Sequence, residues 1–350
     1  TTSFVVLVLL WIGKELLSIS KSANTHKAIK CEADLSKLPA GKYQITFAVT
    51  DKSRKIAEKT IPLTVAPPAR TEVTFDSNKT CYANGKPFFP IGLYHVSPAA
   101  VGILNQSASK IGLPDIDLYK MMKEVKARGF NVIHHTWGMP TEEYLKEAEA
   151  DGLWVIPEVA APTAEQVELA NKFSNVLMWY GSDEPAGERL TFIKNALIQT
   201  SKLDPHRPVS AAVCYPELFK PALEGFDFVM MDPYFVGMNV FYEIGNWVNK
   251  GYEASDNTKA VWLVPQSFTI GATNWSEPTP EELRCQAYIG LVHGAKGFIW
   301  YAFWTSEFWP GNIKGRNMWY LPETPLWDYF PKLNAEIADM SDIYLMGKSL

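Results

Sequence analysis

Near its centre the chain reads Val176-Leu177-Met178-Trp179-Tyr180-Gly181-Ser182-Asp183-Glu184-Pro185. Five consecutive apolar residues are typical of a strand that is buried on both faces, as in a parallel sheet. Similar apolar runs occur at residues 88–94, 131–137, 153–158, 209–215, 226–231, 261–265 and 297–304. Amphipathic stretches such as 118–125 and 190–198 separate these runs. Eight strand–helix units within residues 86–345 predict an α/β fold, a (β/α)8 TIM barrel, rather than an open doubly wound sheet.

Residues 1–68 carry a different pattern. The stretch 41–49 alternates apolar and polar residues, as a half-buried strand does, and turn-forming residues flank it on both sides. We therefore expect a small β-sandwich domain at residues 1–68, either complete or cut at its first strands. The run Ala66-Pro67-Pro68 is a stiff extended connection. Residues 69–85 then form a linker with one short entry strand, and the barrel domain follows at 86–345.

The start of the chain gives two further expectations. The apolar run at 4–12 is too short to span a bilayer, and no basic residue precedes it as in a signal peptide. We therefore expect a buried strand there and no membrane span. Thr1 is not a start methionine, so we expect the sequence to be a piece of a longer protein.

The composition argues against several classes of protein. The 350 residues include 33 basic and 38 acidic side chains without a dense Lys/Arg run, so nucleic acid is not an expected partner. Cys31, Cys81, Cys214 and Cys285 show no metal-ligand spacing, so we expect free buried thiols and no metal site. No glycine-rich nucleotide motif follows any run, so no cofactor is expected.

Polar and aromatic side chains follow the apolar runs, where the carboxyl ends of the strands would meet in a barrel. In chain order, the candidate site residues are His134, Trp137, Glu158, Asp183, Glu184, Asp232, Tyr234, Gln266, Trp304 and Glu307. Carboxylates and aromatic rings dominate this set. Aromatic faces stack on sugar rings, and carboxyl groups bind hydroxyls and act as acids and bases. The sequence therefore predicts a site for an oligo- or polysaccharide.

Three segments also resemble a known family. Residues 84–92, 129–133 and 179–185 are similar to the barrel entry, the second strand and the fourth strand end of a large glycoside hydrolase clan. This clan includes β-galactosidases and cellulases. The resemblance covers residues 82–345 and implies a (β/α)8 catalytic barrel. It also implies that Glu184 is the general acid/base and that Tyr234 approaches the nucleophile, while Trp304 forms the floor of the sugar subsite.

Two positions depart from the pattern of the clan. Asp183 stands where Asn is common, which places a second carboxylate beside Glu184 and should raise the pKa of one of them. Gln266 stands where the clan carries its nucleophilic Glu, and an amide cannot form the ester intermediate. The candidates for a displaced nucleophile are Glu307, then Asp232 and Glu158. Otherwise the reaction inverts, with one carboxylate activating water, or catalysis has been lost.

The leading hypothesis is a cofactor-independent glycosidase that cleaves β-linked glycans, with its catalytic carboxylates among Glu184, Glu307 and Asp232. The other candidate residues would bind the substrate. The main alternative is a catalytically impaired carbohydrate-binding or structural protein on the same scaffold. A third hypothesis is a metal-dependent hydrolase that uses His134, Glu158 and Asp232. The expected location is secreted, periplasmic or cell-surface.

Four of the acidic candidates also have a purely structural alternative. Glu184 and Asp183 precede a helix, and either could cap its N-terminus. Asp232 precedes a proline at a strand end, so it could form a turn. Glu307 could be a solvated loop residue.

Overall fold

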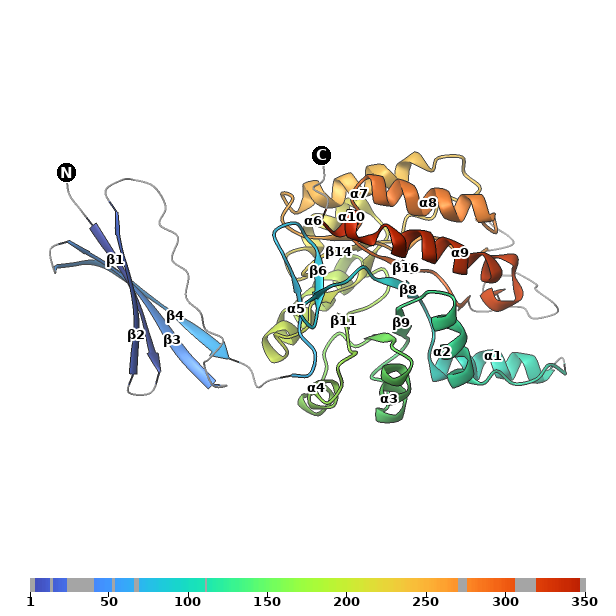
Figure 1. Ribbon diagram of the computed structural model, residues 1–350, viewed down its shortest axis with the longest axis horizontal. Coiled ribbons are helices and arrows are strands. Elements are labelled where there is room, and N and C mark those ends of the chain that lie inside the picture. Colours follow the sequence, from blue (N-terminus) through green and yellow to red (C-terminus); the bar gives the residue numbers. More distant parts are fainter. Residues whose placement is uncertain are drawn as a thin grey trace. The chain divides into compact units, whose positions relative to one another are not determined.

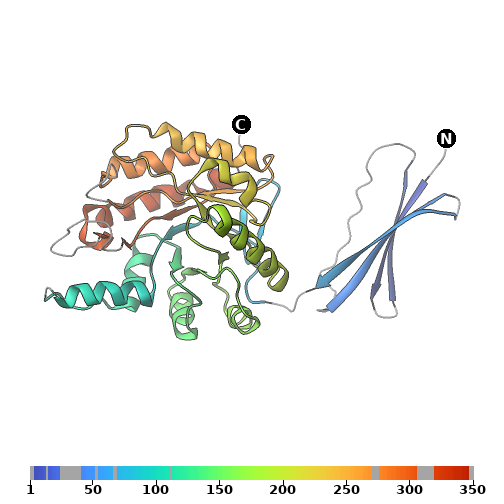
Figure 2. The same ribbon diagram turned by 180° about the vertical axis from the view of Figure 1, so that it is seen from behind.

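The structure is a computed structural model, shown from two sides in Figures 1 and 2. It describes residues 4–12, 15–23, 41–51, 54–65, 69–110, 112–269, 276–305 and 319–346. The chain divides into two compact units, Thr1–Pro68 and Ala69–Leu350.

The first unit is an antiparallel sheet. Strands β1 (Phe4–Ile12), β2 (Glu15–Ala23), β3 (Gly41–Asp51) and β4 (Arg54–Val65) pair in the order β2-β1-β3-β4. The predicted β-sandwich is wrong for the residues described in this unit, because these strands join edge to edge in one sheet. A period-2 pattern shows that one face of a strand is apolar, but it does not show whether a second sheet covers that face.

The second unit is built on a parallel sheet of seven strands. Their order is β10-β9-β8-β16-β15-β14-β13, and every neighbouring pair is parallel. The strands are β8 (Ile91–Leu93), β9 (Val132–His135), β10 (Trp154–Pro157), β13 (Ala212–Val213), β14 (Val229–Met231), β15 (Val261–Leu263) and β16 (Phe298–Trp300). Each of them lies within one of the apolar runs of the sequence.

The predicted closed (β/α)8 barrel is wrong. Strand β11 (Trp179–Tyr180) does not join the sheet as an eighth strand but forms a separate parallel pair with β12 (Val209–Ser210). Isolated bridges, Val155↔Val176 and Glu158↔Tyr180, connect this region to the edge strand β10. Pro157, the last residue of β10, lies between the bridged residues Val155 and Glu158 and has no N–H to donate, which interrupts a continuous ladder. An apolar run predicts a strand but not the partner of that strand.

Two small antiparallel sheets accompany the parallel one. The first consists of β5 (Val73–Phe75), β6 (Cys81–Ala83) and β7 (Lys86–Pro87). The second pairs β17 (Trp304–Thr305) with β18 (Trp319–Tyr320).

Helices lie around the outside of the parallel sheet (Figures 1 and 2). They are α1 (Pro98–Lys110), α2 (Leu118–Ala127), α3 (Glu142–Ala150), α4 (Ala164–Asn171), α5 (Gly187–Leu203), α6 (Phe219–Ala222), α7 (Tyr242–Ala254), α8 (Pro280–Val292), α9 (Pro325–Asp339) and α10 (Ser341–Met346). Thr163 and Thr279 begin α4 and α8 with capping boxes, which pair N–H groups that the helix leaves free.

In the part of the chain that the structure describes, no helix is both long enough and apolar enough to cross a membrane.

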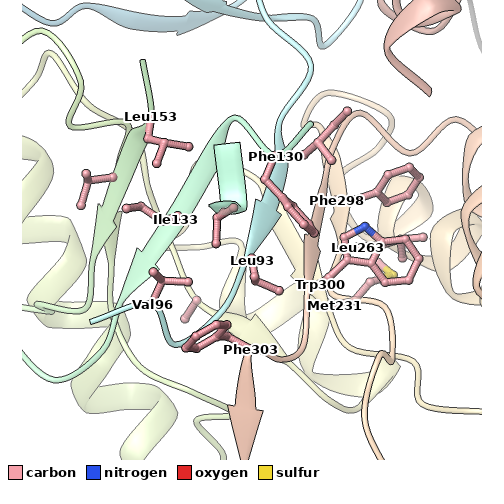
Figure 3. Packing of buried hydrophobic residues seen from close by; sticks show 14 of the residues in the cluster. Leu93, Val96, Phe130, Ile133, Leu153, Met231, Leu263, Phe298, Trp300 and Phe303 are labelled. Atoms are coloured by element: carbon pink, nitrogen blue, oxygen red, sulfur yellow. The ribbon is translucent and has the colours of Figure 1, made fainter. Parts of the chain in front are cut away.

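Both faces of the parallel sheet are packed with apolar side chains. On the face toward the helices, Ile133, Leu263 and Trp300 belong to one large buried cluster (Figure 3). On the other face, Val132 and Trp262 belong to a second buried cluster. Because successive side chains of a strand point to opposite faces, a strand buried on both sides must be apolar throughout. This requirement explains the continuous apolar runs of the sequence.

A buried ion pair holds the separate strand pair β11–β12 in place. Arg207 Nη1 lies 2.7 Å from Asp204 Oδ2, and both side chains are fully buried. The guanidinium also donates to the carbonyl of Val176 and to the C-terminal end of α4. Asp204 accepts a hydrogen bond from the indole Nε1 of Trp179 at 2.8 Å. The pair therefore connects α4, the segment before β11, β11 itself and the start of β12.

We expect Arg207→Met to lower the free energy of unfolding by about 3–5 kcal/mol, because it leaves the Asp204 carboxylate buried without its counter-charge. Urea denaturation followed by tryptophan fluorescence measures this change. Arg284→Met is the matched control, since Arg284 lies 2.8 Å from Glu336 but is half exposed. The control should lose less than about 1 kcal/mol. Equal losses in the two variants would contradict the role given to the buried pair.

Candidate active site

The carboxyl ends of the strands bring four acidic side chains together. Glu158 follows β10, Asp183 and Glu184 follow β11, and Asp232 follows β14. They are close enough for the charge of one carboxylate to raise the pKa of another. These candidate residues therefore form one site, although they come from distant parts of the sequence. Glu307, the remaining acidic candidate, lies outside the described residues.

Glu184 and Asp232 form a carboxyl pair. Asp232 is only 3% exposed, whereas Glu184 is exposed. Burial raises the pKa of Asp232 well above its usual value, and the hydrogen bond to Glu184 and the charges of Glu184 and Asp183 raise it further. A neutral Asp232 can donate its proton in a hydrogen bond to the Glu184 carboxylate. Burial and the neighbouring carboxyl groups therefore favour the protonated form of Asp232.

Cys214 adds a thiol to this carboxyl pair. It follows Val213 of β13, which pairs with Met231 of β14. Cys214 and Asp232 are therefore the first residues after the ends of two neighbouring strands. Burial, followed by the charges of Glu184 and Asp232, raises the pKa of the thiol. Cys214 is therefore protonated at neutral pH.

Asp183 is held by a tyrosine and lies near an arginine. Tyr180 Oη donates a hydrogen bond to Asp183 Oδ1 at 3.0 Å. Burial raises the pKa of Asp183 to about 6, and the charge of Glu184 adds to this rise. The Tyr180 hydrogen bond and the charge of Arg189 act in the opposite direction. Adjacency to Glu184 thus contributes to the raised pKa, but burial is the larger cause.

Glu158 lies between a histidine and a tryptophan. Its Oε2 is 3.9 Å from His134 Nε2 and accepts a hydrogen bond from the backbone N–H of Trp137 at 3.3 Å. Burial raises the pKa of Glu158 to about 7, against the effect of the Trp137 N–H. Burial and two neighbouring histidines lower the pKa of His134 well below its usual value, so its ring is neutral at pH 7. The contact of Glu158 with His134 is therefore polar but not an ion pair.

Aromatic rings surround the acidic side chains. Tyr94 and Tyr234 both pack against Tyr301. The ring centroid of Tyr301 lies 5.4 Å from that of Tyr94 and 5.9 Å from that of Tyr234. Trp137 and Trp304 meet edge to face at 6.4 Å. Trp304, the expected floor of the sugar subsite, is 1% exposed, whereas Trp137 is 59% exposed. The indole of Trp137 thus offers an open apolar face to a ligand.

The backbone is strained at three positions of the site. The φ angle is 66° at His95, 58° at Trp137 and 42° at Glu184. Side chains of this size rarely adopt this left-handed region, which costs on the order of 1–3 kcal/mol per residue. Such strain persists where the surroundings enforce it, and it is concentrated at functional sites. Here it sets the direction of three side chains that follow β8, β9 and β11.

Several buried polar atoms at the strand ends have no hydrogen-bond partner within the described part of the chain. They are His95 Nδ1, both ring nitrogens of His134, Thr136 Oγ1, Asp232 Oδ1, Trp304 Nε1 and Thr305 Oγ1. An unpaired buried polar group costs about 1–3 kcal/mol, and folded proteins pair nearly all of them. A ligand rich in hydroxyl groups could supply both donors and acceptors to this set.

The side chain of Gln266 is occupied by the protein itself. It is fully buried, and its Nε2 donates to Phe268 O at 3.0 Å and to Ser276 O at 3.1 Å. Its Oε1 accepts from the backbone N–H of Val236 at 3.3 Å. Both amide hydrogens are therefore used within the chain, so this candidate has no free donor to offer a substrate.

The metal hypothesis required His134, Glu158 and Asp232. His134 and Glu158 do lie next to each other, but among the described residues no group of three or more His, Cys, Asp or Glu side chains could hold a metal ion.

Sequence reasoning did not single out Tyr94, His95 or Tyr180. Tyr180 lies inside the predicted strand, and it belongs with Met178 to one buried cluster while Trp179 belongs to the other. Strand alternation places Met178 and Tyr180 on the same face, and this signal could have found Tyr180. No comparable signal marks Tyr94 or His95.

Comparisons with known proteins place this arrangement in a known fold. No protein-family model matches the chain, and no curated protein matches it. Solved structures do match, among them a GH2 β-galacturonidase from Eisenbergiella tayi bound to galacturonate, with 17% identity and a TM-score of 0.55. Another is a β-glucuronidase from Bacteroides uniformis covalently bound to cyclophellitol-6-carboxylate aziridine, with 12% identity and a TM-score of 0.51.

The matches cover 96% and 94% of this chain. In the other direction, this chain spans 67% of the β-galacturonidase chain and 46% of the β-glucuronidase chain. The likeness shows that this chain shares their fold.

We expect Glu158→Gln to stabilise the protein at pH 8 but not at pH 4. Folding raises the pKa of Glu158 from 4.5 to about 7, so the folded state binds more protons between these values and its stability falls as the pH rises through them. Above pH 7, ionisation of buried Glu158 lowers the free energy of unfolding of the wild type by an amount on the order of 3 kcal/mol. The amide of Glu158→Gln does not ionise and does not suffer this loss. Urea denaturation of both proteins at pH 4 and pH 8 measures the difference.

Glu149→Gln is the control of opposite sign. Burial alone would raise the pKa of Glu149, but two hydrogen bonds from Ser174 and the charge of Arg70 hold it below its usual value. Its carboxylate therefore contributes stability above its unfolded pKa, and its removal should destabilise the protein at pH 8. A Glu158→Gln variant that gains nothing at pH 8 would rule out the buried, charge-disfavouring environment of Glu158.

Proposed function

We propose that the chain is a glycoside hydrolase that acts on β-linked glycans, with Glu184 as the general acid/base. The observation that carries the proposal is the cluster of exposed Glu184 with Asp183 and buried Asp232 among aromatic side chains, in which burial and the neighbouring charges raise the pKa values of both aspartates. A buried carboxyl group whose protonated form is favoured provides the proton that a leaving sugar oxygen requires. The unpaired polar atoms at the site and the fold shared with glycosidase structures support the same proposal.

In the proposed reaction the pair works as one acid. Glu184 takes the proton of Asp232 and delivers it to the glycosidic oxygen while the bond from this oxygen to the anomeric carbon breaks. The leaving sugar gains the proton as a hydroxyl group, and both carboxyl groups of the pair remain ionised. Their charges face the oxocarbenium-like centre and stabilise it. A proton from the attacking water restores the pair.

A further carboxylate is needed on the other face of the sugar ring. Carboxyl groups that act on opposite faces are about 5–5.5 Å apart in retaining enzymes and about 6.5–9.5 Å apart in inverting ones. Asp232 is assigned here as the proton source beside Glu184, so another carboxylate is proposed for the opposite face. We propose Glu307 for it and, after Glu307, Glu158, while His134, Trp137, Asp183 and Tyr234 surround the sugar.

The second candidate function is carbohydrate binding without catalysis. It is favoured by one observation, the amide of Gln266, which occupies the strand end where the resembling clan has its nucleophile and is fully engaged by the backbone. On this alternative, the aromatic and polar side chains bind the glycan and no bond is broken.

We expect Glu184→Gln to lower kcat/KM on β-glycosides with poor leaving groups by about 10²- to 10⁴-fold, because the leaving oxygen loses its proton donor. The loss should be largest for poor leaving groups and small for nitrophenolates, which depart without a proton. A panel of β-galactosides, β-glucosides, β-galacturonides and β-glucuronides provides the substrates. Glu188→Gln, an exposed carboxylate in the first turn of α5, is the control that should retain activity.

Replacing the nucleophile with glycine should abolish turnover and allow rescue by azide. We expect Glu307→Gly to release a glycosyl azide if Glu307 acts on the opposite face, and Glu158→Gly to do so if Glu158 has that role. A wild-type protein that binds glycans but hydrolyses no member of the panel would refute the enzyme and establish the binding alternative.

A further inference from the structure

Two buried tyrosines extend from the acidic site into the protein. Tyr94 follows β8, and Tyr180 is the last residue of β11. Their hydroxyl oxygens are 2.9 Å apart, and Tyr180 Oη is 3.0 Å from Asp183 Oδ1. The backbone N–H of Ala212 donates to Tyr180 Oη at 3.2 Å. The result is a continuous chain of hydrogen bonds from Tyr94 to Asp183.

The chemistry of the partners sets the direction of this chain. An N–H group can only donate, and an ionised carboxylate can only accept. The single hydroxyl hydrogen of Tyr180 therefore points to Asp183, and Tyr94 must donate its own hydrogen to Tyr180. A hydroxyl oxygen that accepts a hydrogen bond becomes a stronger donor, so Tyr94 reinforces the bond that Tyr180 makes.

Asp183 depends on this support because its surroundings disfavour its charge. Burial and the charge of Glu184 raise the pKa of Asp183, while Tyr180 and the charge of Arg189 from α5 oppose the rise. The other titratable groups that feel its charge are Glu158 after β10, Asp232 and Tyr234 after β14, Tyr94 after β8 and Tyr301 after β16.

We propose that Tyr94 and Tyr180 are positioning residues that keep Asp183 ionised while the neighbouring Asp232 retains its proton. The proposal rests on the function proposed for Glu184. A negative Asp183 makes a second negative charge on Asp232 unfavourable, because like charges repel at short range in a poorly solvated site. The two tyrosines therefore act on the acid of the reaction through Asp183 and not through the substrate.

Phenylalanine variants of the two tyrosines test the proposal in the full chain. Carbon-13 NMR titration of the aspartate carboxyl groups, assigned with Asp183→Asn, follows the pKa of Asp183. Tyr180→Phe should raise this pKa by roughly 1 to 2 units, the effect of one hydrogen bond to a charged group. Tyr94→Phe should raise it by less. The double variant should equal Tyr180→Phe, because Tyr94 reaches Asp183 only through Tyr180.

Activity gives a second, independent readout. In glycoside hydrolysis the acid limb of the kcat/KM profile should move to higher pH in the same order of variants as the pKa of Asp183. Tyr252→Phe is the control, since buried Tyr252 on α7 likewise loses one hydrogen bond, to Gly294 O at 2.6 Å. It should move neither readout.

Each contrary result overturns a separate part of the proposal. An unmoved Asp183 pKa in Tyr180→Phe overturns the support given by the tyrosines. A raised pKa with an unchanged pH profile overturns their positioning role. A wild-type protein without hydrolysis refutes the proposed function instead, and the NMR titration then still accepts or rejects the support of Asp183 by the tyrosines.

Discussion

The buried contact between Arg207 and Asp204 fixes the strand from which the site is built. Strand β11 has only two residues, pairs with β12 and meets β10 through isolated bridges, so its backbone hydrogen bonds alone hold it weakly. The indole of Trp179 anchors the strand to Asp204, and Arg207 anchors Asp204 to the end of α4. Asp183 and Glu184 follow β11 within four residues. The placement of both carboxylates therefore depends on the fully buried ion pair of Arg207 and Asp204.

The site contains several features that are each unfavourable for folding. Three of its carboxyl groups have raised pKa values, three of its residues have left-handed backbone, and several of its buried polar atoms are unpaired. Each of these features lowers the stability of the folded chain. They are concentrated at one edge of a sheet whose two faces are otherwise well packed. Such a local excess of unfavourable terms is typical of sites where function, not stability, selects the residues.

The apolar runs of the sequence locate the strands well but not their pairing. A run that is apolar throughout must be buried on both faces, and this requirement alone marks each strand of the parallel sheet. Which strands pair with each other depends on single residues that no periodic pattern of the sequence marks. Examples are the missing N–H of Pro157 and the contacts of Trp179. These details separate β11 from the seven-stranded sheet and make the predicted closed barrel wrong.

The same division holds for the site. Parallel strands place their carboxyl ends at one edge, so the meeting of Glu158, Asp183 and Asp232 could be expected from their positions after apolar runs. The hydrogen bonds from Tyr180 and the engagement of Gln266 could not be expected. They depend on side-chain direction and on loops from other parts of the chain, which no local pattern encodes.

The engagement of Gln266 has an evolutionary consequence. Gln and Glu differ by a single base change, so this position looks one mutation away from carrying a carboxylate. A Glu at this position would lose both donations, to Phe268 O and Ser276 O, and would set its charge against two carbonyl oxygens in a buried site. Compensating changes in the loop around residue 268 would have to come first. The hydrogen bonds of Gln266 thus favour an amide over a carboxylate at this strand end.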